Sequence, residues 1–376
     1  MDPDEPDNSG PMPLPYVALN GDEEGIKILL RQQEVHSDKP DNYGRTPLMH
    51  AAWGGHEVVV KMLLRREEVD PDKPDSYGRT PLFYAAWAGH EVVVEVLLKR
   101  EEVNPDKPDK DGRTPLWHAA LDGHGEVMKT LLGREEVDPN KQDNYGRTPL
   151  SCAAWYAHEE AVKILLAQEE ANPDEPDDHG RTPLSYAAWN GHEEVVKVLL
   201  RREEVNPDRA DNYGRTPLMH AAWNGHGEVV KALLRRDEVN PNESDKYGQT
   251  PLSRAVLSGH GEVVNTLLER DEVNPDEPDD YGRTPLSYAA WNGHEEVLKM
   301  LLWREEVNPE EPDYLGRTPL SYAAWNGHEE VVKILIEWGE VNLYWPDVYG
   351  QTPLMIAARF GHERVTALLK SHELGI

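Results

Sequence analysis

The chain has 376 residues and a formal net charge of −31, from 39 basic and 70 acidic side chains. Such an acidic excess repels phosphate backbones and anionic membrane surfaces, which argues against nucleic acid and membrane partners. The single cysteine, Cys152, excludes an internal disulfide framework and fits a reducing compartment. The first residues lack a signal-peptide pattern, and no apolar run approaches the roughly 18 residues of a membrane span. We therefore expect a soluble, intracellular protein of the cytoplasm.

A Thr-Pro-Leu tripeptide recurs every 34 residues from Thr46 to Thr352, and one further step back reaches the degenerate copy Met12-Pro13-Leu14. A fixed period of this size predicts a solenoid, in which each repeat packs only against its neighbours. We expect a single array over residues 1–376. It would comprise a degenerate capping repeat at 7–40, nine regular repeats at 41–346 and a truncated capping repeat at 347–376.

The sequence of each unit predicts a turn followed by two helices. In the unit that starts at Asp41, "DNYG" is a turn, Thr46 is an N-cap and Pro47 suits the first helical position. The short helix "LMHAAW" ends at Gly55. A second helix begins at "HEV" or "HEE" and closes with "LLRR", so that acidic and basic ends complement its dipole. Helices this short are not stable alone, so stacking between units must bury their apolar faces.

The pattern "G-x-TPL…AA…GH-x-x-V-V-x-x-LL…VN" resembles the ankyrin repeat along essentially the whole chain. The resemblance implies an all-α ankyrin-repeat solenoid of about eleven helix-turn-helix units, with a hairpin-like finger at each junction. The chain departs from the usual pattern where residues such as Met49 and Ser185 replace a histidine, and where the fingers are longer and contain proline. The near-identical copies and acidic, proline-bearing fingers resemble ankyrin arrays of filamentous fungi.

The recurring histidines and acidic fingers raise the question of metal binding. Ten histidines, from His56 to His362, follow the helix-ending glycine position, but each lies in a separate layer and no HExxH motif is present. We interpret them as hydrogen-bonded residues that fix the turn between helices. The fingers lack the spacing and bidentate glutamate of a calcium loop, so they are interpreted as a solvated acidic rim. The sequence predicts no metal and no cofactor.

In the ankyrin pattern, four positions of each unit point into a concave groove, and here they form rows of residues typical of binding hot spots. The tryptophan row comprises Trp53, Trp87, Trp155, Trp189, Trp223, Trp291 and Trp325. The tyrosine row comprises Tyr43, Tyr77, Tyr145, Tyr213 and Tyr281, together with Tyr247 and Tyr349. The arginine row comprises Arg45, Arg79, Arg147, Arg181, Arg215, Arg283 and Arg317, together with Arg113. Four tryptophans are followed by Asn190, Asn224, Asn292 and Asn326.

These rows have two interpretations, which are not exclusive. They could bind a partner, or each arginine could stack on its own layer's aromatic ring or pair with an aspartate of the adjacent finger. Two units break the pattern, and their changes are either drift or contacts that select a partner. The residues concerned are Trp117, Leu121 and Asp122 in one unit, and Arg254 and Leu257 in the other. Tyr156 and Ala157 replace the usual Asn-Gly in a third.

No acid, base or nucleophile cluster stands outside the repeat, so the sequence predicts a non-enzymatic protein. The leading hypothesis is a protein–protein interaction module that holds an extended protein or peptide partner of unknown identity in its groove and along its fingers. The alternative is the ligand-sensing end of a fungal multidomain receptor of the immune type. We expect a monomer. End-to-end association of the arrays is the main alternative.

Overall fold

The computed structural model describes residues 14–32, 35–339 and 341–373. All regular structure in these ranges is helical, from α1 to α22, and no strand occurs there. The all-α class predicted from the repeat is therefore confirmed. The helices belong to two compact units, an N-terminal unit that ends at Asp178 and a C-terminal unit that begins at His179.

The helices of the N-terminal unit are α1 (Leu14–Leu19), α2 (Glu23–Leu30), α3 (Pro47–Trp53), α4 (Glu57–Leu63), α5 (Pro81–Trp87), α6 (Glu91–Leu97), α7 (Pro115–Leu121), α8 (Gly125–Leu132), α9 (Pro149–Trp155) and α10 (Glu159–Leu166).

The helices of the C-terminal unit are α11 (Pro183–Asn190), α12 (Glu193–Leu199), α13 (Pro217–Asn224), α14 (Gly227–Leu233), α15 (Pro251–Ser258), α16 (Gly261–Leu268), α17 (Pro285–Asn292), α18 (Glu295–Leu302), α19 (Pro319–Asn326), α20 (Glu329–Trp338), α21 (Pro353–Arg359) and α22 (Glu363–Glu373).

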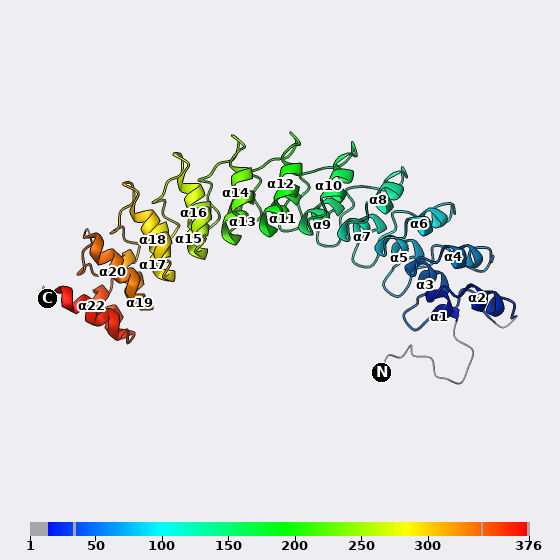
Figure 1. Cartoon of the computed structure of the whole chain (residues 1–376), viewed down its shortest axis with the longest axis horizontal. Coiled ribbons are helices and arrows are strands. Elements are labelled where there is room, and N and C mark those ends of the chain that lie inside the picture. The colour runs from blue at the N-terminus through cyan, green and yellow to red at the C-terminus, as the bar shows by residue number, and fades with distance from the viewer. Residues whose placement is uncertain (1–13, 33–34, 340, 374–376) are drawn as a thin grey trace. The chain divides into compact units, whose positions relative to one another are not determined.

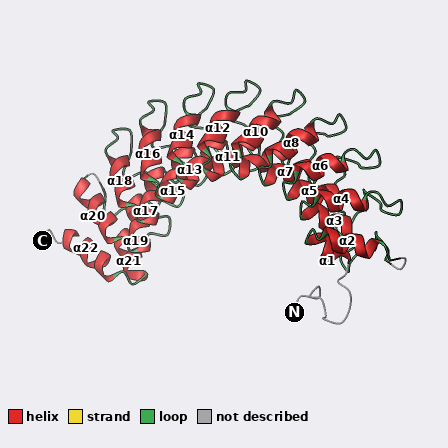
Figure 2. Cartoon of the chain, turned by 45° about the vertical axis from the view of Figure 1, so that its right-hand side comes forward, coloured by secondary structure: helices red, strands yellow, loops and turns green. Residues whose placement is uncertain are grey.

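Within each unit the helices form two parallel rows. The odd-numbered helices, which are the first helices of the repeats, pack side by side along one row, and the even-numbered helices pack along the other (Figure 1). The loops that lead from each even-numbered helix to the next odd-numbered helix extend beyond the helices as fingers (Figure 2). Each repeat therefore contacts only its neighbours in the row, as expected for a solenoid.

The local sequence explains why each first helix begins where it does. The Thr80 side chain accepts a hydrogen bond from the Phe83 N–H at 3.2 Å, and Pro81 occupies the first turn, where no N–H is needed. The paired alanines Ala85 and Ala86 are fully buried, because their small side chains let the neighbouring helices approach closely. The predicted caps and helix starts are thus observed.

The histidine row joins successive repeats. Nε2 of His90 lies 2.9 Å from the carbonyl oxygen of Trp53, which ends the first helix of the preceding repeat. The glycine between these residues, Gly55, has a φ of +71°, and a Cβ there would lie 2.6 Å from the His90 ring. Equivalent bonds are made by His56, His124, His158, His226, His260, His294, His328 and His362. The histidines thus satisfy helix-end carbonyls across the repeat junctions.

The single array with two capping repeats stays a prediction. Residues 7–13 and 33–34 of the first capping repeat, 340 of the last regular repeat and 374–376 of the last capping repeat lie outside the described residues. None of the helices that the structure describes is long and apolar enough to cross a membrane.

Candidate binding surface

The aspartate that begins each repeat organises the base of its finger. We call these residues the anchor aspartates; they are Asp41, Asp75, Asp109, Asp143, Asp177, Asp211, Asp245, Asp279, Asp313 and Asp347. In Asp75, Oδ1 accepts the N–H groups of Tyr77 at 2.7 Å and Arg79 at 2.8 Å, while Oδ2 accepts the Tyr84 hydroxyl at 2.7 Å. The side chain thereby closes the turn and ties it to helix α5.

Several arginines of the predicted row pair with the anchor aspartate of their own repeat. Arg147 donates to Oδ2 of Asp143 from Nε at 2.9 Å and from Nη2 at 2.6 Å, and Arg283 makes the same two bonds to Asp279. Arg45 contacts Asp41 at 2.8 Å. Charge-assisted bonds of this geometry fix both partners. These three pairs lie within one finger. Arg113 and Arg317 instead approach the anchor aspartate of the adjacent finger, Asp143 at 4.0 Å and Asp347 at 3.9 Å, as the sequence suggested.

The arginines also stack on the tyrosine row. The guanidinium carbons of Arg45, Arg79, Arg147, Arg215 and Arg283 lie 4.7–5.2 Å from the ring centroids of Tyr43, Tyr77, Tyr145, Tyr213 and Tyr281, respectively. Three arginines instead contact a ring on the first helix: Arg113 lies over Trp117, Arg181 over Tyr186 and Arg317 over Trp325. The predicted cation–π interpretation of the row is therefore observed.

The tyrosine row remains the most exposed of the predicted rows. The exposed fractions of Tyr43, Tyr77 and Tyr145 in the N-terminal unit are 40%, 50% and 57%, and those of Tyr213, Tyr247 and Tyr281 in the C-terminal unit are 45%, 44% and 57%. These tyrosines lie at the bases of the fingers, where the main-chain N–H groups of Tyr77, Tyr213 and Tyr281 donate to the anchor aspartates. They are held in place and still offer area to a partner.

The tryptophan row packs mainly along the stack. The Trp53 ring stacks on Trp87 with centroids 6.2 Å apart, and Trp291 lies 5.0 Å from the ring of Tyr322. Trp53 and Trp291 are 40% and 39% exposed, and the other members of the row are half-buried. These indoles are therefore partly exposed, and rings such as Trp53 and Trp291 pack against the neighbouring repeat.

The asparagine row bonds to the protein's own backbone. Nδ2 of Asn190, Asn224 and Asn292 donates to the carbonyl four residues earlier at 3.0–3.1 Å, and Nδ2 of Asn326 donates to the Trp291 carbonyl at 3.0 Å. One end of each amide is thus committed to a helix carbonyl, and the side chains are half-buried.

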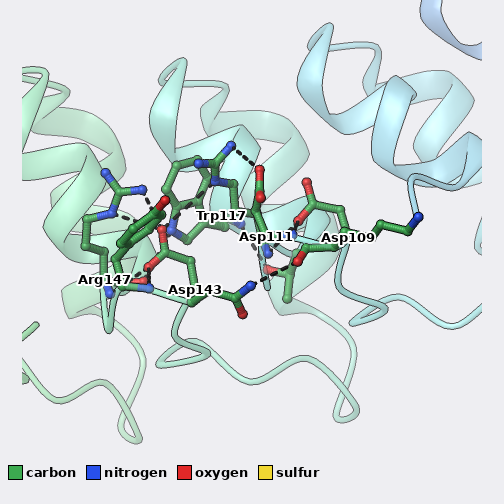
Figure 3. A network of polar contacts seen from close by, with 10 residues as sticks. Asp109, Asp111, Trp117, Asp143 and Arg147 are labelled. Carbon is green, nitrogen blue, oxygen red and sulfur yellow. Dashed lines mark hydrogen bonds and ion pairs between the residues drawn. The ribbon is translucent and has the colours of Figure 1, made fainter. Parts of the chain in front are cut away.

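The repeat that begins at Asp109 has a different arrangement (Figure 3). Trp117 is only 3% exposed, stacks under Arg113 at 5.0 Å, and donates from Nε1 to the Arg147 carbonyl at 3.3 Å. Arg113 turns to Asp111, 3.2 Å away. Leu121 is half-buried and Asp122 is exposed at the end of α7. Trp117 is thus part of the stack, and we leave it out of the proposed contact surface.

His118, next to that tryptophan, is buried without a hydrogen-bond partner. Both ring nitrogens are unpaired among the described residues, whereas His50 lies 3.1 Å from its anchor aspartate. Burial, followed by the nearby Arg113 and Arg79, lowers the pKa of His118 to about 3. The ring is therefore neutral at physiological pH, and its unmet hydrogen bonds cost stability.

We expect His118→Tyr to stabilise the protein by about 1 kcal/mol, because one satisfied hydrogen bond replaces two buried, unpaired nitrogens. In the equivalent positions, Tyr84 and Tyr288 donate their hydroxyls to their anchor aspartates at 2.7 Å and 2.5 Å. The free energy of unfolding in urea measures the gain. His50→Tyr, which starts from a paired histidine, is the control and should change little. Equal effects of the two substitutions would contradict the explanation.

The repeat that begins at Asp245 carries a second internal pair. Arg254 is 7% exposed, donates to Oδ2 of Asp245, and lies 4.8 Å from the Trp223 ring. Leu257 is half-buried, and its carbonyl accepts the His294 bond. Arg254 therefore replaces the usual Tyr or His in the link to the anchor aspartate, and it too is left out of the proposed contact surface.

A second set of aspartates near the finger tips was not singled out by the sequence reasoning. We call Asp38, Asp72, Asp106, Asp208 and Asp276 the tip aspartates; each lies three residues before an anchor aspartate. Burial raises the pKa of each of them, to about 6 for Asp106 and Asp276. The signal that could have found them is the lysine of "PDKPD" at 71–75 and 105–109, which is replaced by glutamate in "PNESD" at 241–245 and "PEEPD" at 309–313.

Asp276 should make stability depend on pH in the direction opposite to an ordinary ion-paired carboxylate. Its folded-state pKa of about 6 exceeds the ordinary value of about 3.9, so between these values the folded state binds a proton that the unfolded state does not. Its destabilising effect, full at pH 7, therefore fades as the pH falls through 6. We expect Asp276→Asn to melt higher than the native protein at pH 7, with the difference shrinking below pH 6 and closing only near about pH 4. A difference independent of pH would be inconsistent with the raised pKa.

Neither the cysteine nor the acidic groups form a reactive or metal-binding centre in the described residues. Cys152 is 3% exposed, and burial raises the pKa of its thiol. No group of three or more His, Cys, Asp or Glu side chains in the described ranges could hold a metal ion.

A family model described as "Ankyrin repeats (3 copies)" matches residues 14–109, 93–177, 169–245, 237–313 and 304–376. These overlapping matches cover nearly the whole chain. No curated protein matches the sequence significantly.

Proposed function

The chain belongs to the ankyrin-repeat family, and from this premise we propose that it is a non-enzymatic binding protein that holds an extended protein segment against its tyrosine row. Ankyrin repeats generally mediate protein–protein interaction and form scaffolds. We propose further that the protein acts as a monomer and without a cofactor.

The observation that carries the proposal is the exposure of the tyrosine rings. Tyr213, Tyr247 and Tyr281 expose 44–57% of their surface, although their main-chain N–H groups are bound by the anchor aspartates and the rings of Tyr213 and Tyr281 lie under Arg215 and Arg283. A ring that is already ordered loses little conformational entropy on binding, and tyrosine is enriched among binding hot spots. The exposed faces of Trp53 and Trp291 add apolar area in their respective units.

The other rows contribute indirectly. Arg45, Arg147 and Arg283 are committed to their anchor aspartates, and the asparagines to helix carbonyls. In this proposal they orient the aromatic rings and leave their remaining donors for a partner. The repeated spacing favours a partner that is itself extended over several repeats.

The test is capture of a partner from cell extract by the native chain and by two triple variants. One changes Tyr213, Tyr247 and Tyr281 to Ser; the matched control changes the exposed Glu262, Glu296 and Glu330 of the second helices to Ser. Since hot-spot side chains contribute more than about 1 kcal/mol each, the tyrosine variant should lose at least tenfold in capture and the control should not. Equal capture by both folded variants would exclude the tyrosine row as the contact surface.

A further inference from the structure

In the N-terminal unit each tip aspartate is neutralised by a lysine of the following finger. Nζ of Lys73 lies 2.5 Å from Oδ2 of Asp38 and 3.2 Å from its main-chain carbonyl. Lys107 contacts the same two atoms of Asp72, each at 2.8 Å. Nζ of Lys141 lies 3.7 Å from Asp106. The finger thus builds a site for one ammonium group from a carboxylate and the carbonyl of the same residue.

Two fingers of the C-terminal unit, at Asp208 and Asp276, keep the aspartate and lack the lysine that would face it. The residues 35 positions after Asp208 and Asp276 are Glu243 and Glu311. The backbone framework is preserved, because Oδ2 of Asp208 and of Asp276 accepts the N–H groups of Asn240 at 2.6 Å and Asn308 at 3.0 Å. In both tip aspartates Oδ1 is buried without a hydrogen-bond partner, as in Asp38, Asp72 and Asp106. The site has the same construction and lacks its cation.

The replacing glutamates place a second negative charge beside the first. Asn308 donates to Glu311 at 2.8 Å and Asn240 donates to Glu243 at 2.9 Å, which holds each glutamate on its own finger. Burial, and then Glu311, disfavours the charged form of Asp276, and Glu243 acts in the same way on Asp208. A like-charged pair of this kind is unfavourable in the free protein and attracts a cation.

We propose that Asp208 and Asp276 each receive the ammonium group of a lysine side chain from the bound protein segment. The independent evidence is the chain's own Lys73 and Lys107, whose ammonium groups occupy the equivalent sites of the N-terminal unit. The net charge of −31 complements a basic segment. This inference rests on the proposed function and adds the chemical class of the partner, a lysine-bearing segment.

The position of the two sites also gives the spacing of the lysines. The finger between them carries the neutral Asn242, so the charged sites occupy alternate fingers. Two layers of about 10 Å each separate them by about 20 Å. An extended chain advances about 3.4 Å per residue, so lysines about six residues apart would reach both sites.

The experiment measures the affinity of a decalysine peptide for the full chain by calorimetry at 150 mM salt. Glu243→Lys with Glu311→Lys supplies the missing ammonium groups internally. Glu203→Lys with Glu305→Lys makes the same change in net charge at exposed positions in the turns that follow α12 and α18. The first variant should melt higher than the native chain and bind decalysine at least fivefold more weakly. The second should bind within twofold of the native chain. Asp208→Asn with Asp276→Asn should weaken binding like the first, since Asn242 shows that asparagine is accommodated.

Equal weakening by the two lysine variants would overturn the proposal, because it would show diffuse charge attraction. Displacement of decalysine by millimolar calcium, beyond that caused by sodium chloride of equal ionic strength, would also overturn it in favour of a metal site. The test is separate from that of the tyrosine row. If decalysine binds at the two sites and the tyrosine variant captures the partner as the native chain does, only the proposed contact surface is refuted. If the tyrosine variant loses the partner and decalysine does not bind at the two sites, only the lysine preference is refuted.

Discussion

Asp279→Ala is expected to destabilise the C-terminal unit by about 3–5 kcal/mol, the loss typical of breaking a buried charge pair. Oδ1 of this anchor aspartate accepts the N–H groups of Tyr281 at 2.9 Å and Arg283 at 2.8 Å. Its Oδ2 accepts both the Arg283 guanidinium and the Tyr288 hydroxyl. Removing the carboxylate takes the acceptor from five donor atoms around a residue that is only 3% exposed.

Hydrogen exchange at the backbone amides of Tyr281 and Arg283 checks this prediction, because repeat proteins can open locally. Protection should fall there and in the adjacent repeats. Asp280→Ala, at the exposed neighbouring position, is the control and should cost much less. A loss below about 1 kcal/mol for Asp279→Ala would show that the anchor aspartate is not what holds the finger to its helix.

Gly259→Ala should destabilise the same unit by about 2–3 kcal/mol. This glycine has a φ of +77°, which costs a residue with a side chain about 1–2 kcal/mol. A Cβ there would also lie 2.6 Å from the His294 ring and displace it from its bond to the Leu257 carbonyl, worth about 1 kcal/mol. Urea unfolding of the variant measures the sum.

The opposite substitution, alanine to glycine, can be made at the equivalent position of another repeat. Ala157 occupies the equivalent position with a φ of +63° and is the one non-glycine residue in the described ranges with a positive φ. Ala157→Gly should therefore stabilise the protein by about 0.5–1 kcal/mol, after the entropy that glycine adds to the unfolded chain is subtracted. Destabilisation by both substitutions would contradict the role assigned to this position.

The repeat predicted the fold in detail because each element rests on local signals. Thr46 and Pro47 start α3 as the sequence suggested, and the histidines that follow the glycines are hydrogen-bonded. The roles within the rows could not be predicted, since they depend on distances between repeats. Trp117 and Arg254 were singled out as departures from the pattern, and only the packed structure shows that both are buried.

The roles of the arginine row could not be predicted from the sequence either. Whether Arg147 binds a ligand or the aspartate four residues earlier depends on the path of the finger, which brings Oδ2 of Asp143 within 2.6 Å of Nη2. The loss of lysine from the later fingers was visible in the sequence. Its consequence, an aspartate without a facing lysine, follows only from the structure, in which Lys73 contacts Asp38, 35 residues earlier.

Photo-crosslinking tests most directly the claim that the tyrosine row is the contact surface. A benzophenone amino acid would replace Tyr213 or Tyr281 in one set of proteins and the exposed Glu262 or Glu296 of the second helices in another. We predict that irradiation in cell extract links one partner protein at both tyrosine positions and at neither glutamate. Crosslinks to that partner only from the glutamate positions would contradict it.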